Sequence, residues 1–266
     1  MSKYKIGFIG CGNMGGALVT AAAKNIDGKS IAVCDFDKSK TDKFHKEYGA
    51  VVTDAKDIAA NADFVLLAVK PQVMESAIAD FAAELKANAN ATVITIAAGL
   101  SIAAIRSFIG GSLPTIRIMP NTPVALGAGM ILYTLADVDS GVEADFLKIF
   151  EKAGVFDKIP EDKIDAGSAL SGCGPAFVYA FAEALADGAV ECGVPRDKAA
   201  LYAAQTLLGA AEMLLEFGHP ADLKDAVCSP GGTTIAGIHA LEKAGFRGAT
   251  IEAVTAAYKR TLELKK

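Results

Sequence analysis

The sequence has no tryptophan and only three histidines, and charged residues make up just 21% of its 266 residues. The histidines, His45, His219 and His239, stand apart from any carboxylate or thiol at ligand spacing, so we predict no metal site. Basic residues are outnumbered, 26 against 31 acidic ones, which gives a net charge of −5 and no basic field for nucleic acid or anionic lipid. A small-molecule partner is therefore expected.

Paired cysteines and long apolar runs are also lacking. The five cysteines are odd in number, scattered and never arranged as CxxC, which excludes a disulfide framework or zinc site and fits a reducing cytoplasm. The longest apolar run, residues 93–105, falls short of the roughly 18 residues that a membrane span requires. We therefore expect a cytoplasmic protein with no membrane partner.

Hydrophobic residues make up 52% of the chain, enough for a globular core. Up to about residue 160, short β-branched runs alternate with longer alanine-rich segments, the pattern of β-α-β units. The expected strands are residues 5–10, 30–35, 62–69, 91–97 and 114–119, with two more at 127–134 and 155–160. This half is predicted to be an α/β domain with a parallel-rich sheet.

After residue 160 the periodicity becomes that of long helices. We expect these helices at residues 164–170, 175–192, 196–217, 234–244 and 250–264. The predicted organisation is a dinucleotide-binding domain at 1–161 and an all-α domain at 162–266. The alanine-rich faces of these helices fit two interpretations, close packing within the chain or a buried subunit interface.

A glycine-rich turn follows the first predicted strand and opens a helix. Gly10 would allow the tight turn, Gly12 a close approach to a pyrophosphate, and Gly15 the packing of helix on strand. Asp35 follows about 20 residues later, where an acidic group meets the adenosine ribose. Asp35 favours NAD, yet Lys38 and Lys40 could attract the extra phosphate of NADP, so the choice stays open. The alternative is a glycine-rich turn without a ligand.

Further polar groups follow the later strands. In an open α/β sheet the carboxyl ends of the strands form the ligand crevice. Lys70 and Asn121 lie at such ends and could reach the nicotinamide ribose, the carboxamide or the substrate. For Lys70 the alternative is an ordinary exposed lysine at a strand end.

Several motifs together resemble one family over essentially the whole chain. They are Gly-Asn-Met-Gly at 12–15, Val-Lys-Pro at 69–71, Met-Pro-Asn-Thr-Pro at 119–123, Leu-Ser-Gly-Cys-Gly-Pro-Ala at 170–176 and Leu-Lys-Asp-Ala-Val-Cys-Ser-Pro-Gly-Gly-Thr-Thr at 223–234. The chain resembles the pyrroline-5-carboxylate reductases, and the last motif is the specific one. Many members have Ser where this chain has Cys173, a small departure.

The resemblance implies reduction of (S)-1-pyrroline-5-carboxylate to L-proline by NADH or NADPH. It further implies a Rossmann-like N-terminal domain and an all-α C-terminal domain that forms a homodimer, often within a larger ring. The expected cofactor-binding residues are Gly10, Cys11, Gly12, Asn13, Met14, Gly15, Asp35, Ala68, Val69, Lys70, Pro71, Ala97, Ala98, Gly99 and Asn121. The expected substrate-binding residues are Ser229, Pro230, Gly231, Gly232, Thr233 and Thr234.

The residues of the 229–234 loop support the same chemistry. Gly231 and Gly232 permit a close backbone approach, and the helix after them offers free N–H groups to a carboxylate. Thr234 is the expected catalytic residue, because hydride transfer to a C=N bond needs a hydrogen bond or proton at nitrogen. The alternative is a plain helix start capped by Ser229 or Thr233.

Two other functions share part of this pattern. A β-hydroxyacid dehydrogenase shares the two-domain plan, but it carries a catalytic lysine four residues after the second glycine of the second domain, where this chain has Val178. A nucleotide-sensing protein without turnover would need no loop like that at 229–234. We therefore predict an imine reductase.

Overall fold

The computed structural model describes residues 2–264. The chain divides into two compact units. The first runs up to Cys173 and includes the residues from Ala257 on, and the second is Gly174–Ala256. We describe each unit by itself. The expected domain boundary between residues 161 and 162 stays a prediction.

The first unit is built on an eight-stranded sheet with the order β3-β2-β1-β4-β5-β6-β7-β8. The strands are β1 Tyr4–Ile9, β2 Ile31–Cys34, β3 Val51–Val52, β4 Ala62–Leu67, β5 Thr92–Thr95, β6 Thr115–Met119, β7 Gly129–Ala136 and β8 Gly154–Lys158. All neighbouring strands are parallel except β6 and β7. The prediction of a parallel-rich Rossmann-like sheet is confirmed, although β3 was not predicted.

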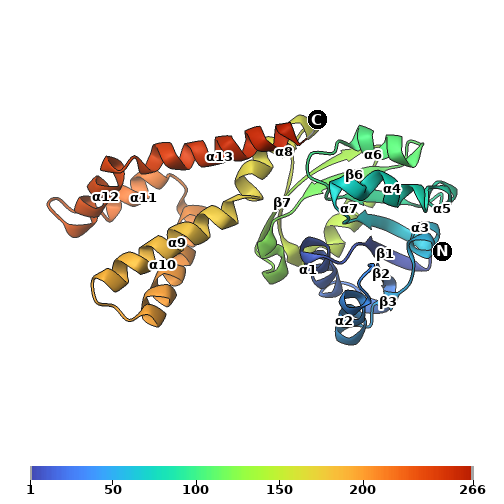
Figure 1. The fold of residues 1–266 in the computed structure, drawn as a ribbon, viewed down its shortest axis with the longest axis horizontal. Helices are drawn as coiled ribbons and strands as arrows, with labels where there is room; N and C mark the ends of the chain where they lie inside the picture. Colours follow the sequence, from blue (N-terminus) through green and yellow to red (C-terminus); the bar gives the residue numbers. More distant parts are fainter. Residues whose placement is uncertain (1, 265–266) are drawn as a thin grey trace. The chain divides into compact units, whose positions relative to one another are not determined.

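Helices cover both faces of this sheet (Figure 1). They are α1 Asn13–Ala23, α2 Lys38–Tyr48, α3 Ala55–Asn61, α4 Met74–Ala79, α5 Ala82–Ala87, α6 Ile102–Ile109, α7 Ser140–Ile149 and α8 Glu161–Ser171. Short 3-10 helices lie at η1 Gly28–Ser30, η2 Pro71–Val73, η3 Thr122–Leu126 and η4 Glu151–Ala153.

The continuous apolar run in β4 is explained by helices that pack on both faces of the sheet. Phe64 and Leu66 belong to the core cluster that contains residues of α1, α2 and α7. Val65 and Leu67 point the other way, into the cluster that contains residues of α3, α4, α5 and α6. Because successive side chains of a strand point to opposite faces, both faces of this strand must be apolar.

The second unit is helical, as predicted. Its helices are α9 Gly174–Glu191, α10 Arg196–Phe217, α11 Pro220–Ala226, α12 Thr233–Lys243 and α13 Phe246–Glu263, whose last residues belong to the first unit. The bounds of α10 are those expected from the sequence, whereas α11 was not predicted. The helices α9 and α10 lie side by side (Figure 1).

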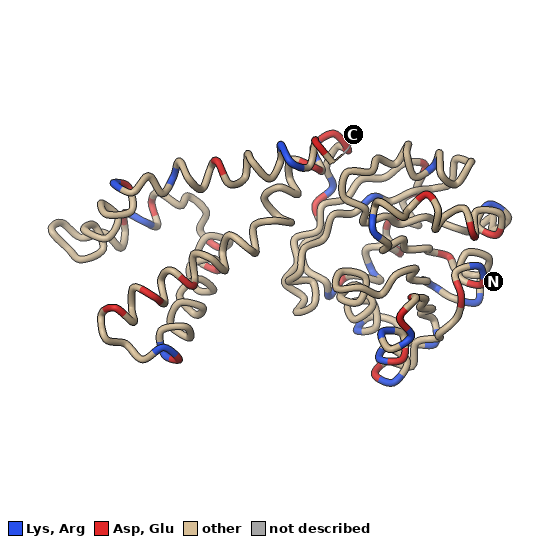
Figure 2. Tube along the Cα trace, viewed as in Figure 1, with Lys and Arg blue, Asp and Glu red and all other residues tan. Residues whose placement is uncertain are grey.

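This helical unit buries very little of its own apolar surface. Among its described residues, only Ala186, Ala199 and Ala203 are buried hydrophobic residues. Large apolar side chains such as Leu201, Tyr202 and Leu208 are more than half exposed on α10. Figure 2 shows long uncharged stretches on the same helices, and no charged residue stands between Lys198 and Glu212. The surface of the unit is therefore typical of one that another protein surface covers.

The segment Glu161–Glu191 is long and apolar enough to cross a membrane by length and composition, and 11% of its most apolar window is buried. The expectation that no segment is long enough to span a membrane considers only uninterrupted runs of apolar residues. Mean hydropathy over a window tolerates the few charges of α9, such as Glu183 and Asp187. The same composition is typical of a helix at a subunit interface.

Candidate functional site

The glycine turn between β1 and α1 assigns a different role to each glycine. Gly10 has a φ of +101°, and a Cβ there would lie 2.7 Å from the carbonyl oxygen of Ala68. A Cβ at Gly15 would collide with the carbonyl oxygen of Gly10. A Cβ at Gly12 would meet no atom within 4 Å. The fold itself thus requires Gly10 and Gly15, whereas the space beside Gly12 is open.

Asp35 follows β2 and is held beside this turn. Its carboxylate accepts hydrogen bonds from the N–H of Cys11 at 2.7 Å and from the N–H of Asp37 at 2.9 Å. Lys40 of α2 places its Nζ 3.7 Å from the same carboxylate. Burial, followed by the charge of Asp35, raises the pKa of the Cys11 thiol to about 12. Cys11 therefore stays a neutral thiol and contributes to the turn through its backbone.

A cavity of about 430 Å³, here called the dinucleotide cavity, opens at the carboxyl ends of β1, β2 and β4. It brings together six of the predicted cofactor residues: Gly10, Gly12, Asp35, Ala68, Val69 and Lys70. Its remaining lining residues are Ile9, Cys34, Phe36, Lys40, Ala55, Val73, Ala77, Asp80 and Phe81. The cavity is mostly apolar, and it lies at the edge of a parallel sheet where Rossmann-like folds bind dinucleotides.

Most of these additional lining residues could not have been found from the sequence. Val73, Ala77, Asp80 and Phe81 come from η2, α4 and the segment after α4, and carry no motif. There are two exceptions: Lys40 is already expected from its charge, and Phe36 directly follows the acidic position of the fingerprint. The position of Phe36 next to Asp35 is the sequence signal for its place at the cavity.

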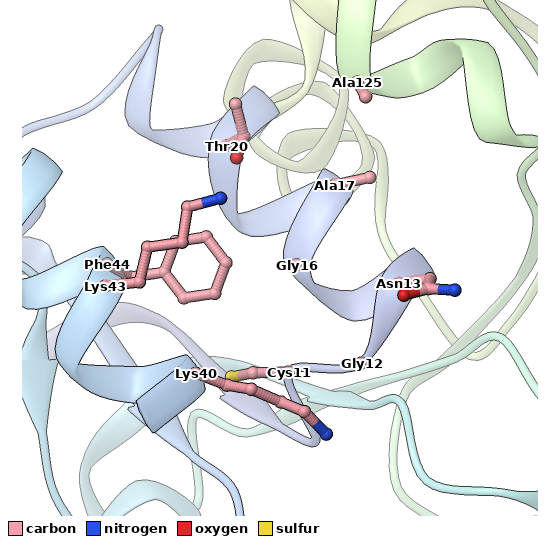
Figure 3. Close-up of a pocket in the computed structure, with 10 residues that line it drawn as sticks. All are labelled: Cys11, Gly12, Asn13, Gly16, Ala17, Thr20, Lys40, Lys43, Phe44 and Ala125. Atoms are coloured by element: carbon pink, nitrogen blue, oxygen red, sulfur yellow. The ribbon is translucent and has the colours of Figure 1, made fainter. Parts of the chain in front are cut away.

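A second cavity, of about 380 Å³, lies on the other side of the turn, between α1 and α2. It shares Gly12 and Lys40 with the dinucleotide cavity and adds two further predicted cofactor residues, Cys11 and Asn13. Figure 3 shows Lys43 and Phe44 extending from α2 on the side that faces α1. Its remaining lining residues are Gly16, Ala17, Thr20 and Ala125.

Seven predicted cofactor residues line neither cavity. Met14 and Gly15 lie in α1, Pro71 begins η2, and residues 97–99 follow β5. Asn121 is almost fully buried, and its amide donates to the carbonyl of Ser171 at 2.9 Å and accepts from the N–H of Met130 at 3.0 Å. These bonds hold the segment after β6, and a role of Asn121 at the cofactor stays a prediction.

The 229–234 loop spans most of the connection between α11 and α12 and includes Thr233 and Thr234, the first two residues of α12. Gly231 has a φ of +69°, and the N–H of Gly232 donates to the carbonyl of Ser229 at 3.0 Å. A Cβ at Gly232 would lie 2.5 Å from the Ser229 hydroxyl oxygen. The positive φ of Gly231 is the conformation that favours glycine, whereas Gly232 leaves room for the Ser229 hydroxyl packed against it.

The start of α12 is suited to an anion. Gly232 is its N-cap, and no side chain caps the helix, so capping by Ser229 or Thr233 is not what the structure shows. Thr233 and Thr234 are exposed. The first N–H groups of a helix have no partner within it, and the helix dipole adds partial positive charge there. The loop can thus present backbone N–H groups and two hydroxyls to a small acid.

Residues 161–264 match the family model described as pyrroline-5-carboxylate reductase dimerisation, and residues 5–99 match one described as NADP oxidoreductase, coenzyme F420-dependent. The pyrroline-5-carboxylate reductase of Escherichia coli (strain K12) is 41% identical over 99% of both chains. This chain belongs to the pyrroline-5-carboxylate reductase family. The member from Synechocystis sp. is 43% identical, again over 99% of both chains.

Solved structures of the family agree with this assignment. The pyrroline-5-carboxylate reductase of Coxiella burnetii superposes with a TM-score of 0.90 at 35% identity, over 99% of both chains. The Plasmodium falciparum enzyme, solved with NADP bound, gives a TM-score of 0.89 at 31% identity over the whole of both chains. The resemblance, the fold class and the oxidoreductase assignment are confirmed, and the β-hydroxyacid dehydrogenase alternative is set aside. Family membership also supports a nicotinamide dinucleotide as cofactor and assembly into a homo-oligomer.

Within residues 2–264 no group of three or more His, Cys, Asp and Glu residues is placed to hold a metal ion. The proposal of an imine reductase requires none.

Proposed function

We propose that the protein reduces (S)-1-pyrroline-5-carboxylate to L-proline with NADH or NADPH, using the dinucleotide cavity for the cofactor and the 229–234 loop for the substrate. One observation carries the proposal: this member of the family has both the 229–234 loop and open space beside Gly12. A bound reduced nicotinamide supplies a hydride to the carbon of the C=N bond.

The residues around the glycine turn fit a dinucleotide. The missing Cβ at Gly12 lets the pyrophosphate approach the backbone, where the first N–H groups of α1 point at it. Asp35 accepts hydrogen bonds from the adenosine ribose. Lys70, exposed after β4, is assigned to the nicotinamide ribose or carboxamide, together with residues 97–99 and Asn121.

The substrate is a small cyclic imino acid with one carboxylate. Its carboxylate binds the N–H groups at the start of α12, with Ser229 and Thr233 as additional donors. The hydroxyl of Thr234 donates a hydrogen bond to the imine nitrogen, where the electron pair of the C=N bond collects as the carbon accepts hydride. A proton from water completes the amine. Thr234 is the catalytic residue in this proposal.

The proposal also covers the oligomeric state and the cellular location of the protein. We infer a homodimer through the helices between residues 175 and 217, because their exposed apolar side chains need a cover, and a larger ring of such dimers. The same cover accounts for the apolar segment Glu161–Glu191 without a membrane. The proposed location is the cytoplasm, in keeping with five free cysteines.

The direct test is an assay of the purified protein with NADH and NADPH against a panel of cyclic imino acids, with detection of L-proline as well as cofactor oxidation. Circular dichroism of the same sample shows that the protein is folded. We expect proline from 1-pyrroline-5-carboxylate. Folded protein that forms no proline with either cofactor would refute the proposal.

A further inference from the structure

The end of β2 carries an acid and an aromatic residue, Asp35 and Phe36, at the mouth of the dinucleotide cavity. We infer that these two residues make the protein prefer NADH to NADPH. The inference deepens the proposed function, because it concerns the same cavity. It rests on the positions of the charged groups and of one exposed ring.

Asp35 is a fixed acceptor and not a mobile surface acid. Only 12% of its side chain is exposed, and two backbone N–H groups hold its carboxylate. A ribose 2′-hydroxyl can donate to such a carboxylate in a charge-assisted hydrogen bond. The 2′-phosphate of NADPH has no such donor and brings negative charge against a carboxylate that cannot turn away.

Lys40 does not reverse this balance. Its Nζ lies 3.7 Å from the Asp35 carboxylate, so the two charges act on a nearby phosphate with opposite sign and from similar positions. Lys38 lines neither of these two cavities, and Lys43 lines the cavity between α1 and α2 but not the dinucleotide cavity. The charged residues around the dinucleotide cavity are two acids, Asp35 and Asp80, and two lysines, Lys40 and Lys70. No net positive charge is available to replace the water around a 2′-phosphate.

Phe36 gives the cavity an aromatic wall without a charge. Its side chain is fully exposed, although it lines the mouth of the cavity. Val69, Val73 and Ala77 supply aliphatic surface to the same cavity. A flat base between a ring and aliphatic side chains would be covered on two faces, and the exposed ring would lose its contact with water. An arginine in this position could both stack on adenine and bind a 2′-phosphate, whereas phenylalanine can only stack.

The test is a fluorescence titration of NADH and NADPH against the whole protein in the absence of any imine. We expect NADH to bind about 10- to 100-fold more tightly than NADPH. This ratio is smaller than that of a site selective for a hydroxyl group with no lysine nearby, because Lys40 attracts the 2′-phosphate. Asp35→Ser should reduce this ratio about tenfold or more, because serine keeps a short acceptor for the loop but removes the charge. Phe36→Arg should raise the affinity for NADPH alone, and the double variant should prefer NADPH.

Controls separate the local effect from folding and from net charge. Phe36 is fully exposed, so its substitution leaves the fold intact even if Asp35→Ser loosens the turn. Asp42→Asn removes one negative charge, as Asp35→Ser does, but from an exposed position on α2 that lines neither of the two cavities. It should leave the ratio of NADH to NADPH affinity unchanged. A wild-type protein that binds NADPH as tightly as NADH would overturn the inference. The inference would also be overturned if neither Asp35→Ser nor Phe36→Arg changed the ratio of NADH to NADPH affinity. Because no imine is present, a failure of the proposed reaction leaves this result unaffected.

Discussion

Arg117 of β6 and Asp165 of α8 form an ion pair with 2.7 Å between Nη2 and Oδ1, and the two side chains are 2% and 3% exposed. Glu161 adds a second carboxylate 3.5 Å from Nη1 of the same arginine. Glu161 also accepts a hydrogen bond from the N–H of Ile102 at the start of α6. This charged cluster joins α8 to the sheet at the place where the chain leaves the sheet unit for the helices that follow.

Removing one partner of this pair should be costly, because the other charge would stay buried. Asp165→Leu is expected to lower the free energy of unfolding by about 3–5 kcal/mol. The double variant Arg117→Met/Asp165→Leu should recover much of that loss, since both fully buried charges are gone and Glu161, which loses its arginine, is partly exposed to water. Urea denaturation measures both. Asp162→Asn, which breaks an exposed pair with Lys163, is the control and should change stability by less than about 0.5 kcal/mol. A double variant as unstable as Asp165→Leu would contradict the explanation.

Asp57 in α3 should make the free energy of unfolding depend on pH in the acidic range. The hydroxyl of Tyr4 donates to it at 2.7 Å, and this bond, with those from Thr53 and Lys3, lowers the pKa of Asp57. Because the pKa is lower in the folded state, the stabilisation is present above the unfolded value of about 3.9 and is lost as the pH falls through the folded value. Asp57→Asn should therefore destabilise the protein at neutral pH, and the difference should shrink below about pH 4. Thermal unfolding across this range measures it, and a constant difference would speak against the assignment.

Two glycines of the same turn should respond differently to alanine. Gly12→Ala places its methyl group in open space and should change the unfolding temperature by no more than about 2 °C, while weakening NAD(P)H binding about tenfold or more. Gly15→Ala forces a Cβ against the Gly10 carbonyl and should destabilise the fold itself. Thermal unfolding and cofactor titration of both variants give the comparison. Normal cofactor affinity in Gly12→Ala would show that the pyrophosphate does not approach there.

Thr234 should act on the rate and not on cofactor binding. If its hydroxyl bonds the imine nitrogen as charge shifts, Thr234→Val removes a contact made in the transition state and should lower kcat about ten- to a hundredfold. The loss is smaller than for an oxyanion donor, because the imine can already carry a proton. Thr234→Ser should retain more activity. Steady-state kinetics and NAD(P)H titration separate the two effects. Full kcat in Thr234→Val, or a defect only in cofactor binding, would exclude the proposed role.

The exposed apolar face of α10 should hold the subunits together. Leu208 is 53% exposed, and Leu208→Glu should shift the protein towards monomers or aggregates, because a buried charge without a partner is unfavourable. Light scattering at low protein concentration measures the change. Ala89→Glu adds the same charge at an exposed position between α5 and β5 and should leave the mass unchanged. A wild-type protein that is an active monomer would contradict dimerisation through these helices.

Local patterns were enough for much of the fold. The apolar run 64–67 could only be a strand covered on both faces, and the helical period of residues 196–217 predicted α10 to the residue. The glycine spacing at 10, 12 and 15 predicted a dinucleotide turn because each of its requirements is met within a few residues of backbone. The two residues of β3 carry no periodicity and could not be found in this way.

Only the tertiary structure showed which distant residues complete the site. Val73, Ala77 and Phe81 meet Asp35 at one cavity because β1, β2 and β4 end at the same edge of the sheet, a relationship that no local pattern contains. Arg117 lies in a strand that reads as apolar, and its charge is tolerated only because Asp165, far along the chain, is buried beside it. The sequence by itself determined what depends on neighbouring residues, namely the strands, the helices and the two glycine-rich turns. Packing decided the rest, because the partners of buried charges and the walls of cavities come from segments that only folding brings together.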